Sequence, residues 1–265
     1  MIAGDKVDTV GGKLRLVFGT GALHRLAFSR QRQALLRSAL DAGFRAFDVA
    51  PAYGNGVGEI ELGLAIRGER ERCQINTKFG IPIPIYGAHS RHCFLLWRLA
   101  DKVLGWSDRA YLRRDFSLKA MERSLNASLK RLHTDYVDTL FIHEPIADLL
   151  QSQMDSLVHC ISDLKSKGKI RRFGIAGPRE SIVRCKDLGS IDIYQTSWGD
   201  AEHLWDIAAN RPVILYGTYA AFRSQNRFAK LSEFVRDQLG QHPNSSAILA
   251  TNSPHRVRQL GDVVQ

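Results

Sequence analysis

The sequence contains little cysteine and no long hydrophobic run. Its four cysteines stand at positions 73, 93, 160 and 185, with no CxxC pair and no zinc-ligand spacing. Ordinary thiols in a reducing compartment are therefore expected rather than a disulfide framework or a zinc site. No apolar stretch approaches the ~18 residues of a membrane span, and the first residues lack a basic region followed by an apolar one. We expect a soluble cytoplasmic protein with no membrane partner.

Three common cofactor and catalytic motifs are also missing. The run Gly19-Thr20-Gly21 would need a glycine at position 24 to form a Rossmann fingerprint, and His24 stands there. The sequence has no P-loop lysine motif and no GxSxG nucleophile elbow. These absences argue against the protein classes that depend on those motifs.

The composition is that of a globular protein. The 265 residues are 44% hydrophobic and 24% charged, with only 8 prolines, so the chain can bury a full core. Its net charge of +10 could attract nucleic acid, anionic lipid or a phosphorylated small molecule. A solvated basic surface explains the charge equally well. Because no long Lys/Arg run is present, we expect no specific nucleic-acid partner.

Eight short β-type runs alternate with helical segments along the whole chain. The predicted strands are residues 14–19, 45–48, 73–78, 136–142, 172–176, 191–195, 213–216 and 246–251. Such alternation requires a parallel sheet with right-handed crossovers, and eight units are the number that closes a (β/α)8 barrel. The sequence thus predicts one α/β domain over residues 1–265. Residues 80–115 form an enlarged loop after strand 3, with a short helix at 94–103.

The helical segments carry their own signals. The predicted helices are residues 29–42, 59–66, 117–132, 153–167, 180–186, 201–209, 227–239 and 254–263. Ser29 and Ser117 are expected N-caps. Ile60, Gly63 and Leu64 are expected to face inward from the second helix.

Four polar residues fall at or just beyond predicted strand ends: Asp48, Tyr53, Lys78 and His143. In barrels of this kind the chemistry gathers at the carboxyl ends of the strands. Each residue alone has an ordinary explanation. The aspartate could cap a helix, the tyrosine could lie in a turn, the lysine could be solvated, and the histidine could be hydrogen-bonded within the protein at a strand end. None is specific by itself.

Together the four residues fit one chemistry. A free tyrosine has a pKa near ~10, so it exchanges protons poorly at neutral pH. The Lys78 ammonium is expected to lower the pKa of Tyr53, and a buried Asp48 would keep Lys78 charged and aimed. His143 could then orient a substrate oxygen by a hydrogen bond. Hydride must come from a cofactor, because no side chain can donate one. The set suits a carbonyl reductase or alcohol dehydrogenase that uses no metal.

Several segments resemble the aldo-keto reductase superfamily. They are FDVAPAYGNGVGEIELG at residues 47–63, TKFG at 77–80, the run from 124 to 145, and KGKIRRFGI at 167–175. These motifs are most similar to those of the sugar-dehydrogenase and pyridoxal-dehydrogenase branch. The resemblance implies a TIM barrel that binds NADP(H) or NAD(H) across the strand ends. It implies that Tyr53 is the acid/base, that Asp48 and Lys78 tune it, and that His143 lies across the substrate oxygen.

The resemblance also implies a cofactor site. Gln195 would bond the nicotinamide carboxamide, and Tyr216 would stack on the nicotinamide ring. Arg256 matches an arginine that can pair with a 2′-phosphate, which favours NADP(H) over NAD(H). The full implied set is Gly19, Thr20, Gln195, Tyr216, Gly217, Thr218, Thr251, Asn252, Arg256 and Gln259.

The sequence departs from the family pattern in places. Ala176-Gly177 stands where Ser-Asn usually bonds the nicotinamide amide, and Ala250 stands where a basic residue is common. Each lost hydrogen bond weakens cofactor binding by roughly 1 kcal/mol. The segment after Tyr216 and the C-terminal loops are expected to be short, so residues 80–115, with Trp97 and Trp106, are a candidate pocket wall. An ordinary packed lid is an equal alternative.

These features leave three functions open. The first is an NAD(P)(H)-dependent oxidoreductase acting on a carbonyl or sugar substrate, in either direction. The second is a nucleotide-binding sensor or regulatory subunit with little turnover. The third is a degenerate enzyme that no longer holds cofactor. The substrate and the oligomeric state stay undetermined at this stage.

Overall fold

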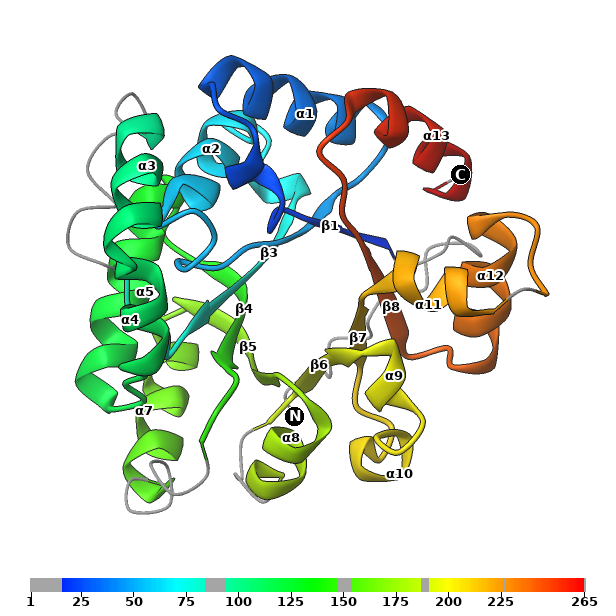
Figure 1. Cartoon of the computed structure of the whole chain (residues 1–265). Coiled ribbons are helices and arrows are strands. Elements are labelled where there is room, and N and C mark those ends of the chain that lie inside the picture. The colour runs from blue at the N-terminus through cyan, green and yellow to red at the C-terminus, as the bar shows by residue number, and fades with distance from the viewer. Residues whose placement is uncertain (1–15, 84–93, 147–153, 187–190, 226, 265) are drawn as a thin grey trace.

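The computed structural model is a closed barrel of eight parallel strands in sequence order, β1 to β8, with β8 pairing back to β1. It describes residues 16–83, 94–146, 154–186, 191–225 and 227–264. The strands are β1 Leu16–Gly19, β2 Ala46–Asp48, β3 Gln74–Phe79, β4 Val137–His143, β5 Ile170–Ala176, β6 Ile193–Ser197, β7 Val213–Tyr216 and β8 Ser245–Leu249. The predicted (β/α)8 barrel is confirmed (Figure 1).

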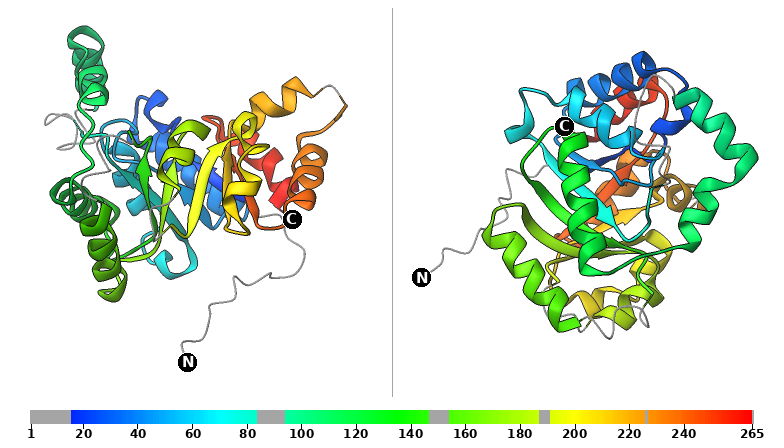
Figure 2. Two further views of the ribbon diagram at one scale, coloured as in Figure 1. Left: turned by 90° about the horizontal axis from the view of Figure 1, so that it is seen from below. Right: turned by 90° about the vertical axis from the view of Figure 1, so that its left-hand side faces the viewer.

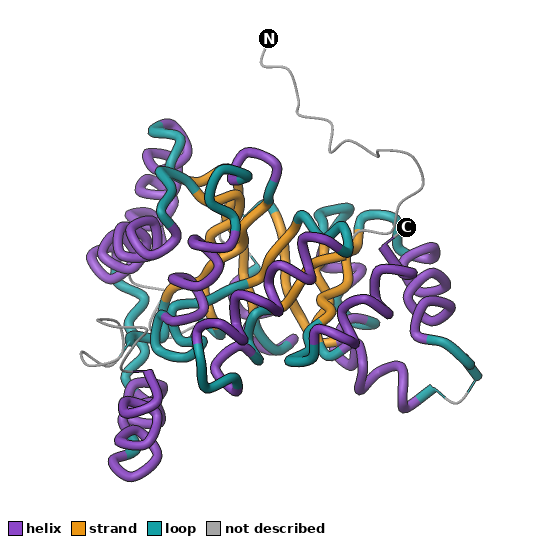
Figure 3. The backbone as a smooth tube through the Cα atoms, turned by 90° about the horizontal axis from the view of Figure 1, so that it is seen from above, coloured by secondary structure: helices purple, strands orange, loops and turns teal. Residues whose placement is uncertain are grey.

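Helices surround the barrel on its outside (Figure 3). Their bounds are α1 Ser29–Asp41, α2 Val57–Ala65, α3 Phe94–Leu104, α4 Trp106–Leu112, α5 Leu118–Leu132, α7 Met154–Ser166, α8 Arg179–Cys185, α9 Trp198–Ala201, α10 Trp205–Ala208, α11 Thr218–Ser224, α12 Leu231–Gln241 and α13 Pro254–Val264. Short 3-10 turns are η1 Leu23–Arg25 and η2 Arg70–Arg72. No helix in the described ranges is both long enough and apolar enough to cross a membrane.

Two predicted helices differ from those in the structure. The segment 201–209 is not one helix: α9 ends at Ala201, a turn follows, and α10 covers only Trp205–Ala208. The segment expected at 227–239 is α12, and it is preceded by an extra helix, α11. Gly217, at φ +80, lets the chain turn from β7 directly into α11.

One expected N-cap is confirmed and the other is wrong. The backbone amide of Ala120 donates to the Ser117 hydroxyl over 3.2 Å, so Ser117 caps α5. Ser29 instead lies inside the first turn of α1, and its hydroxyl donates to Glu61 over 3.0 Å. The helix begins one residue earlier than expected, so Phe28 is the N-cap residue, and its amide donates to Gln31 Oε1 over 3.2 Å.

The core has two layers, one inside the barrel and one between the barrel and its helices. Side chains of alternate strand residues point to opposite faces, so each strand contributes to both layers. Val17, Phe141, Ile193, Ile214 and Ile248 fill the interior. Because these apolar side chains fill the barrel interior, a polar functional site can form only at the barrel ends.

Helix α2 packs differently from the expected pattern. Ile60 and Leu64 are only half-buried, while Glu59 and Glu61 are fully buried. Glu61 pairs with Arg32 of α1 over 3.1 Å, and Glu59 accepts from Arg131 of α5 over 2.7 Å. These carboxylates are buried because helices on both sides of α2 supply the partners that they need.

Helices α3 and α4, here called the arm (residues 94–112), project from the body of the barrel on one side (Figure 2). The arm is fastened at both ends. Phe94 is buried, and Arg98 donates to the carbonyls of His24 and Arg25 over 3.1 and 3.3 Å. At the other end Tyr111 bonds Glu144, the residue after β4. The predicted helix at 94–103 is confirmed, and α4 is an additional helix.

Candidate active site

The barrel brings Asp48, Tyr53, Lys78 and His143 together at the carboxyl ends of β2, β3 and β4. Lys78 Nζ donates to both carboxylate oxygens of Asp48, each over 2.8 Å, and to the Tyr53 hydroxyl over 3.2 Å. The rings of Tyr53 and His143 face each other edge-on, with centroids 6.2 Å apart. All four residues therefore belong to one connected site.

Asp48 is the centre of this network. It is 3% exposed, and its Oδ1 also accepts from the side-chain amide of Gln195 over 2.7 Å. The carbonyl of Asp48 accepts from both the amide and the hydroxyl of Thr20, each over 2.9 Å. Asp48 is consequently fixed by strands β1, β3 and β6, and it holds the Lys78 ammonium in one position.

The protonation states are set by burial and by the buried ion pair. Burial alone would lower the pKa of Lys78, but the Asp48 carboxylate and the Tyr53 hydroxyl outweigh it, so this pKa is raised. Burial lowers the pKa of His143 to about 3, helped by the charges of Lys78 and Arg114. At neutral pH the site therefore holds a charged ammonium beside an uncharged imidazole.

Tyr53 departs from the expectation drawn from the sequence. The nearby Lys78 ammonium does lower the pKa of Tyr53, but burial has the larger effect, and this pKa lies above its ordinary value of 10.0. The expected net lowering is therefore not found. The phenol of Tyr53 therefore stays protonated at neutral pH.

The residues implied for a nicotinamide end lie beside Asp48, Tyr53, Lys78 and His143, here called the tetrad. Gln195 and Ala176 are register partners, and Tyr216 stands half-buried at the end of β7. Because the Gln195 amide nitrogen is bonded to Asp48, its Oε1 is the atom left to accept a hydrogen bond from a ligand. Burial raises the pKa of Tyr216 to about 12, so the ring is neutral.

Three other members of the implied set have structural roles. Thr218 accepts from the Trp198 indole over 3.0 Å and donates to the Ile248 carbonyl over 2.7 Å, so its hydroxyl is fully used within the protein. A β-carbon on Gly19 would stand 2.7 Å from the Ile248 side chain. Glycine at this position permits close packing of β1 on β8. Gly217 forms the turn into α11.

The segment implied for the adenosine phosphate begins α13. Thr251 is buried, and its hydroxyl accepts from the backbone amide of Ser253 over 3.2 Å. Asn252 and Arg256 are exposed. Burial raises the pKa of Tyr219, and the Arg256 charge offsets part of this rise. Gln259 lies within α13, but its side chain is outside the described part of the chain.

The structure also places residues in the site that were not in the predicted set. Glu144 follows His143 directly, and its carboxylate Oε2 accepts from Arg114 Nη2 over 2.8 Å and from the Tyr111 hydroxyl. Arg114 Nη1 also donates to the Glu144 carbonyl over 2.9 Å. The sequence signal was present, since Glu144 stands between His143 and Pro145 in a family motif, but its partners lie in the enlarged loop.

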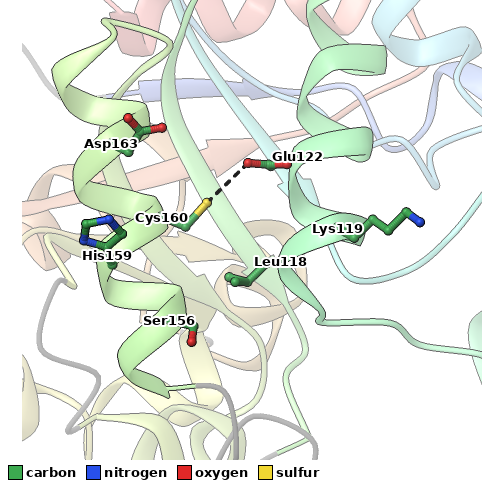
Figure 4. A pocket seen from close by; sticks show the side chains of 7 residues that line it. All are labelled: Leu118, Lys119, Glu122, Ser156, His159, Cys160 and Asp163. Carbon is green, nitrogen blue, oxygen red and sulfur yellow. Dashed lines mark hydrogen bonds between the residues drawn. The ribbon is translucent and has the colours of Figure 1, made fainter.

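A separate surface groove lies between α5 and α7, away from the tetrad (Figure 4). It is lined by Leu118, Lys119, Glu122, Ser156, His159, Cys160 and Asp163. The Cys160 thiol donates to Glu122 over 3.8 Å, and burial raises the pKa of this thiol. Cys160 is thus a protonated, structural thiol. Cys73 and Cys185 are also free and buried, whereas Cys93 lies outside the described residues. Within the described residues no cluster of metal-ligating side chains is found.

Comparison with known proteins agrees with this geometry. Over 172 residues the chain is 27% identical to NADH-specific methylglyoxal reductase of Escherichia coli, covering 63% of this chain and 48% of that protein. It is 28% identical over 180 residues to D-threo-aldose 1-dehydrogenase of a Pseudomonas species, covering 65% and 52%. The chain thus spans about half the length of the curated relatives that it matches.

A solved structure shows the same fold. An aldo-keto reductase from Klebsiella pneumoniae in complex with NADPH superposes with a TM-score of 0.66 at 23% identity, covering 94% of this chain and 85% of that one. The sequence profile of the aldo/keto reductase family matches residues 15–210, which include the whole tetrad. With its closed parallel barrel and this profile match, the chain belongs to the aldo/keto reductase family.

Proposed function

We propose that this protein is an NAD(P)(H)-dependent oxidoreductase that interconverts a carbonyl group and an alcohol. The observation that carries the proposal is the buried hydrogen-bonded chain from Gln195 through Asp48 and Lys78 to the Tyr53 hydroxyl. Such a chain has no obvious structural purpose at the open end of a barrel. It does hold one phenol next to a fixed positive charge, which is what proton transfer to a substrate oxygen requires.

Each residue has a defined role in this proposal. A bound nicotinamide would supply the hydride chemistry. In carbonyl reduction Tyr53 donates its proton to the substrate oxygen, and Lys78 stabilises the phenolate that remains. His143 is uncharged, so it contacts the same oxygen as a neutral hydrogen-bonding partner. Asp48 keeps Lys78 charged throughout.

Several residues fit a nicotinamide dinucleotide. The Gln195 Oε1 can accept from a carboxamide N–H, and the neutral ring of Tyr216 offers a stacking face beside it. Arg256 is exposed at the start of α13, where the backbone amides of a helix N-terminus also favour an anion. We propose NADP(H) as the preferred cofactor because of Arg256, and NAD(H) as the alternative. The substrate class is a small aldehyde, ketone or sugar.

The test is a Tyr53→Phe variant, which removes only the hydroxyl. We expect kcat with NADPH on a panel of aldehydes and aldoses to fall by about 10²–10⁴-fold. Cofactor affinity should stay within twofold, because Tyr53 acts on the substrate oxygen. Tyr136→Phe is the matched control, since Tyr136 precedes β4 at the opposite end of the barrel. Full turnover by Tyr53→Phe contradicts the proposal.

One observation favours a second candidate, a nucleotide-binding sensor with little turnover. Ala176 and Gly177 offer no side-chain hydrogen bonds at the end of β5, so fewer groups are available to hold a nicotinamide in position for hydride transfer. A thermal-shift titration with NADP(H) and NAD(H), followed by the same substrate panel, separates the two functions. Tight binding without turnover on any substrate identifies the sensor.

A further inference from the structure

Glu144 occupies an unusual position beside the proposed nicotinamide site. It has a left-handed backbone, with φ +50, which a residue with a side chain adopts only when its surroundings hold it there. Its backbone amide donates to the Ala176 carbonyl over 2.6 Å, so it lies against the end of β5. The strained conformation therefore places Glu144 next to Ala176 and Gly177.

Glycine at position 177 is coupled to this arrangement. A β-carbon on Gly177 would stand 3.1 Å from the Glu144 α-carbon and 3.6 Å from its Cγ. The Glu144 side chain thus begins beside the space that a side chain at position 177 would enter. A larger residue at 177 and Glu144 in its present conformation do not fit together without a shift.

Two residues at the end of the enlarged loop hold the Glu144 carboxylate. Arg114 donates to its Oε2 over 2.8 Å and to its carbonyl over 2.9 Å, and the Tyr111 hydroxyl also bonds Oε2. The Arg114 guanidinium covers the Tyr111 ring at 4.2 Å. Both loop residues bind the same oxygen. Among the described residues, Oε1 has no hydrogen-bond partner, and the side chain is 32% exposed.

The charge of Glu144 is felt at the site. Burial raises the pKa of Tyr53 and of Tyr216 most, and the Glu144 carboxylate raises both further. Glu144 directly follows β4 and its amide bonds Ala176 at the end of β5, so it stands at the same end of the barrel as Tyr53 and Tyr216. A carboxylate is an acceptor only, so its free oxygen suits an N–H donor on a ligand.

We propose that Glu144 is a cofactor-contact residue whose Oε1 accepts a hydrogen bond from the amino group of the nicotinamide carboxamide. It supplies an acceptor at the strand end where Ala176 and Gly177 offer no side-chain polar group, and Tyr111 and Arg114 are its positioning residues. This inference rests on the proposed function, because it requires a nicotinamide cofactor in the barrel mouth.

The test pairs a change in the protein with a change in the ligand. The ligands are the tighter-binding of NADP⁺ and NAD⁺ and its 3-acetylpyridine analogue, in which a methyl group replaces the carboxamide amino group. Dissociation constants are measured by calorimetry for the wild type, Glu144→Ala and Glu144→Gln. We expect Glu144→Ala to weaken the natural cofactor about tenfold, as for loss of a hydrogen bond to a charged group. The analogue should change less than twofold.

A matched control and two further variants sharpen the result. Glu180→Ala removes an exposed carboxylate just beyond β5, and it should leave both affinities unchanged. Glu144→Gln keeps an acceptor oxygen and should retain part of the discrimination against the analogue. Tyr111→Phe should weaken the natural cofactor a few fold and leave the analogue unaffected, because Glu144 is then held less firmly.

Three outcomes overturn the inference. Equal weakening of both ligands by Glu144→Ala would show a general structural effect, and no weakening would show that Glu144 does not contact the cofactor. Wild-type protein that binds neither natural cofactor would overturn the proposed function as well. Wild-type binding with an unchanged Glu144→Ala variant would overturn this inference alone.

Discussion

Replacing Lys78 with methionine tests how much stability is lost when one partner of the buried Asp48–Lys78 ion pair is removed. Asp48 and Lys78 are 3% and 2% exposed, and their atoms meet in two bonds of 2.8 Å. Methionine has a similar length but no charge, so Asp48 would keep only the Gln195 amide as a side-chain donor. Removal of one partner from a buried pair costs about 3–5 kcal/mol. Because Gln195 still bonds Asp48, we expect a loss near the lower limit, about 3 kcal/mol. That loss corresponds to a fall in Tm of about 6–12 °C.

The assay is urea denaturation of the cofactor-free protein, followed by fluorescence. The double variant Asp48→Asn/Lys78→Met removes both charges and should recover at least about 1 kcal/mol relative to Lys78→Met alone, because no unpaired carboxylate remains. The reasoning is refuted if Lys78→Met is as stable as the wild type. The single variant Asp48→Asn is measured as well. The reasoning is also refuted if the losses in unfolding free energy of the two single variants add up to that of the double variant, since coupled buried charges cannot behave independently.

Further predictions concern proton transfer and helix packing. The pKa of His143 is about 3 and that of Tyr53 is raised above 10, so the rate of carbonyl reduction should stay flat between about pH 5 and 9. It should fall only as pH rises through the Tyr53 pKa, and a wild-type profile with a step near pH 6.5 would contradict the neutral His143. Gly63→Ala should cost about 1–3 kcal/mol, because its β-carbon would stand 2.6 Å from the Leu132 backbone. The control Gly240→Ala in α12, where nothing lies within 4 Å, should stabilise the protein by about 0.5–1 kcal/mol in thermal denaturation.

Much of the fold could be predicted from the sequence because a barrel repeats one simple pattern. Each strand is a short β-type run followed by a helix, and local signals such as the Ser117 cap are strong. The predictions failed where tertiary contacts determine the local structure. Ser29 is not a cap because the helix already begins there, where the Ser29 hydroxyl donates to Glu61 of another helix. Ile60 is not fully buried because α2 buries two paired carboxylates instead.

The candidate site shows the same division. Family motifs brought together Asp48, Tyr53, Lys78 and His143, and the structure places these residues in one network. The sign of the Tyr53 pKa shift could not be predicted, because it depends on how completely the surrounding loops exclude water. The hydrogen bonds that Arg114 and Tyr111 make to Glu144 could not be predicted either, since these partners come from a loop with no family motif.

For the proposed function, the protonation states lead to an expectation about the direction of the reaction. Before reaction the Asp48–Lys78 pair is neutral as a unit, and Tyr53 and His143 are both uncharged. A carbonyl oxygen that gains negative charge would meet a phenol donor backed by an ammonium, which stabilises that charge as it develops. Oxidation of an alcohol starts instead from a phenolate, and burial disfavours the phenolate of Tyr53 at neutral pH. The cost of forming that phenolate falls as pH rises. Under the proposed function we therefore expect reduction to dominate at neutral pH and oxidation to gain as pH rises, which assays of both directions across about pH 6–10 would test.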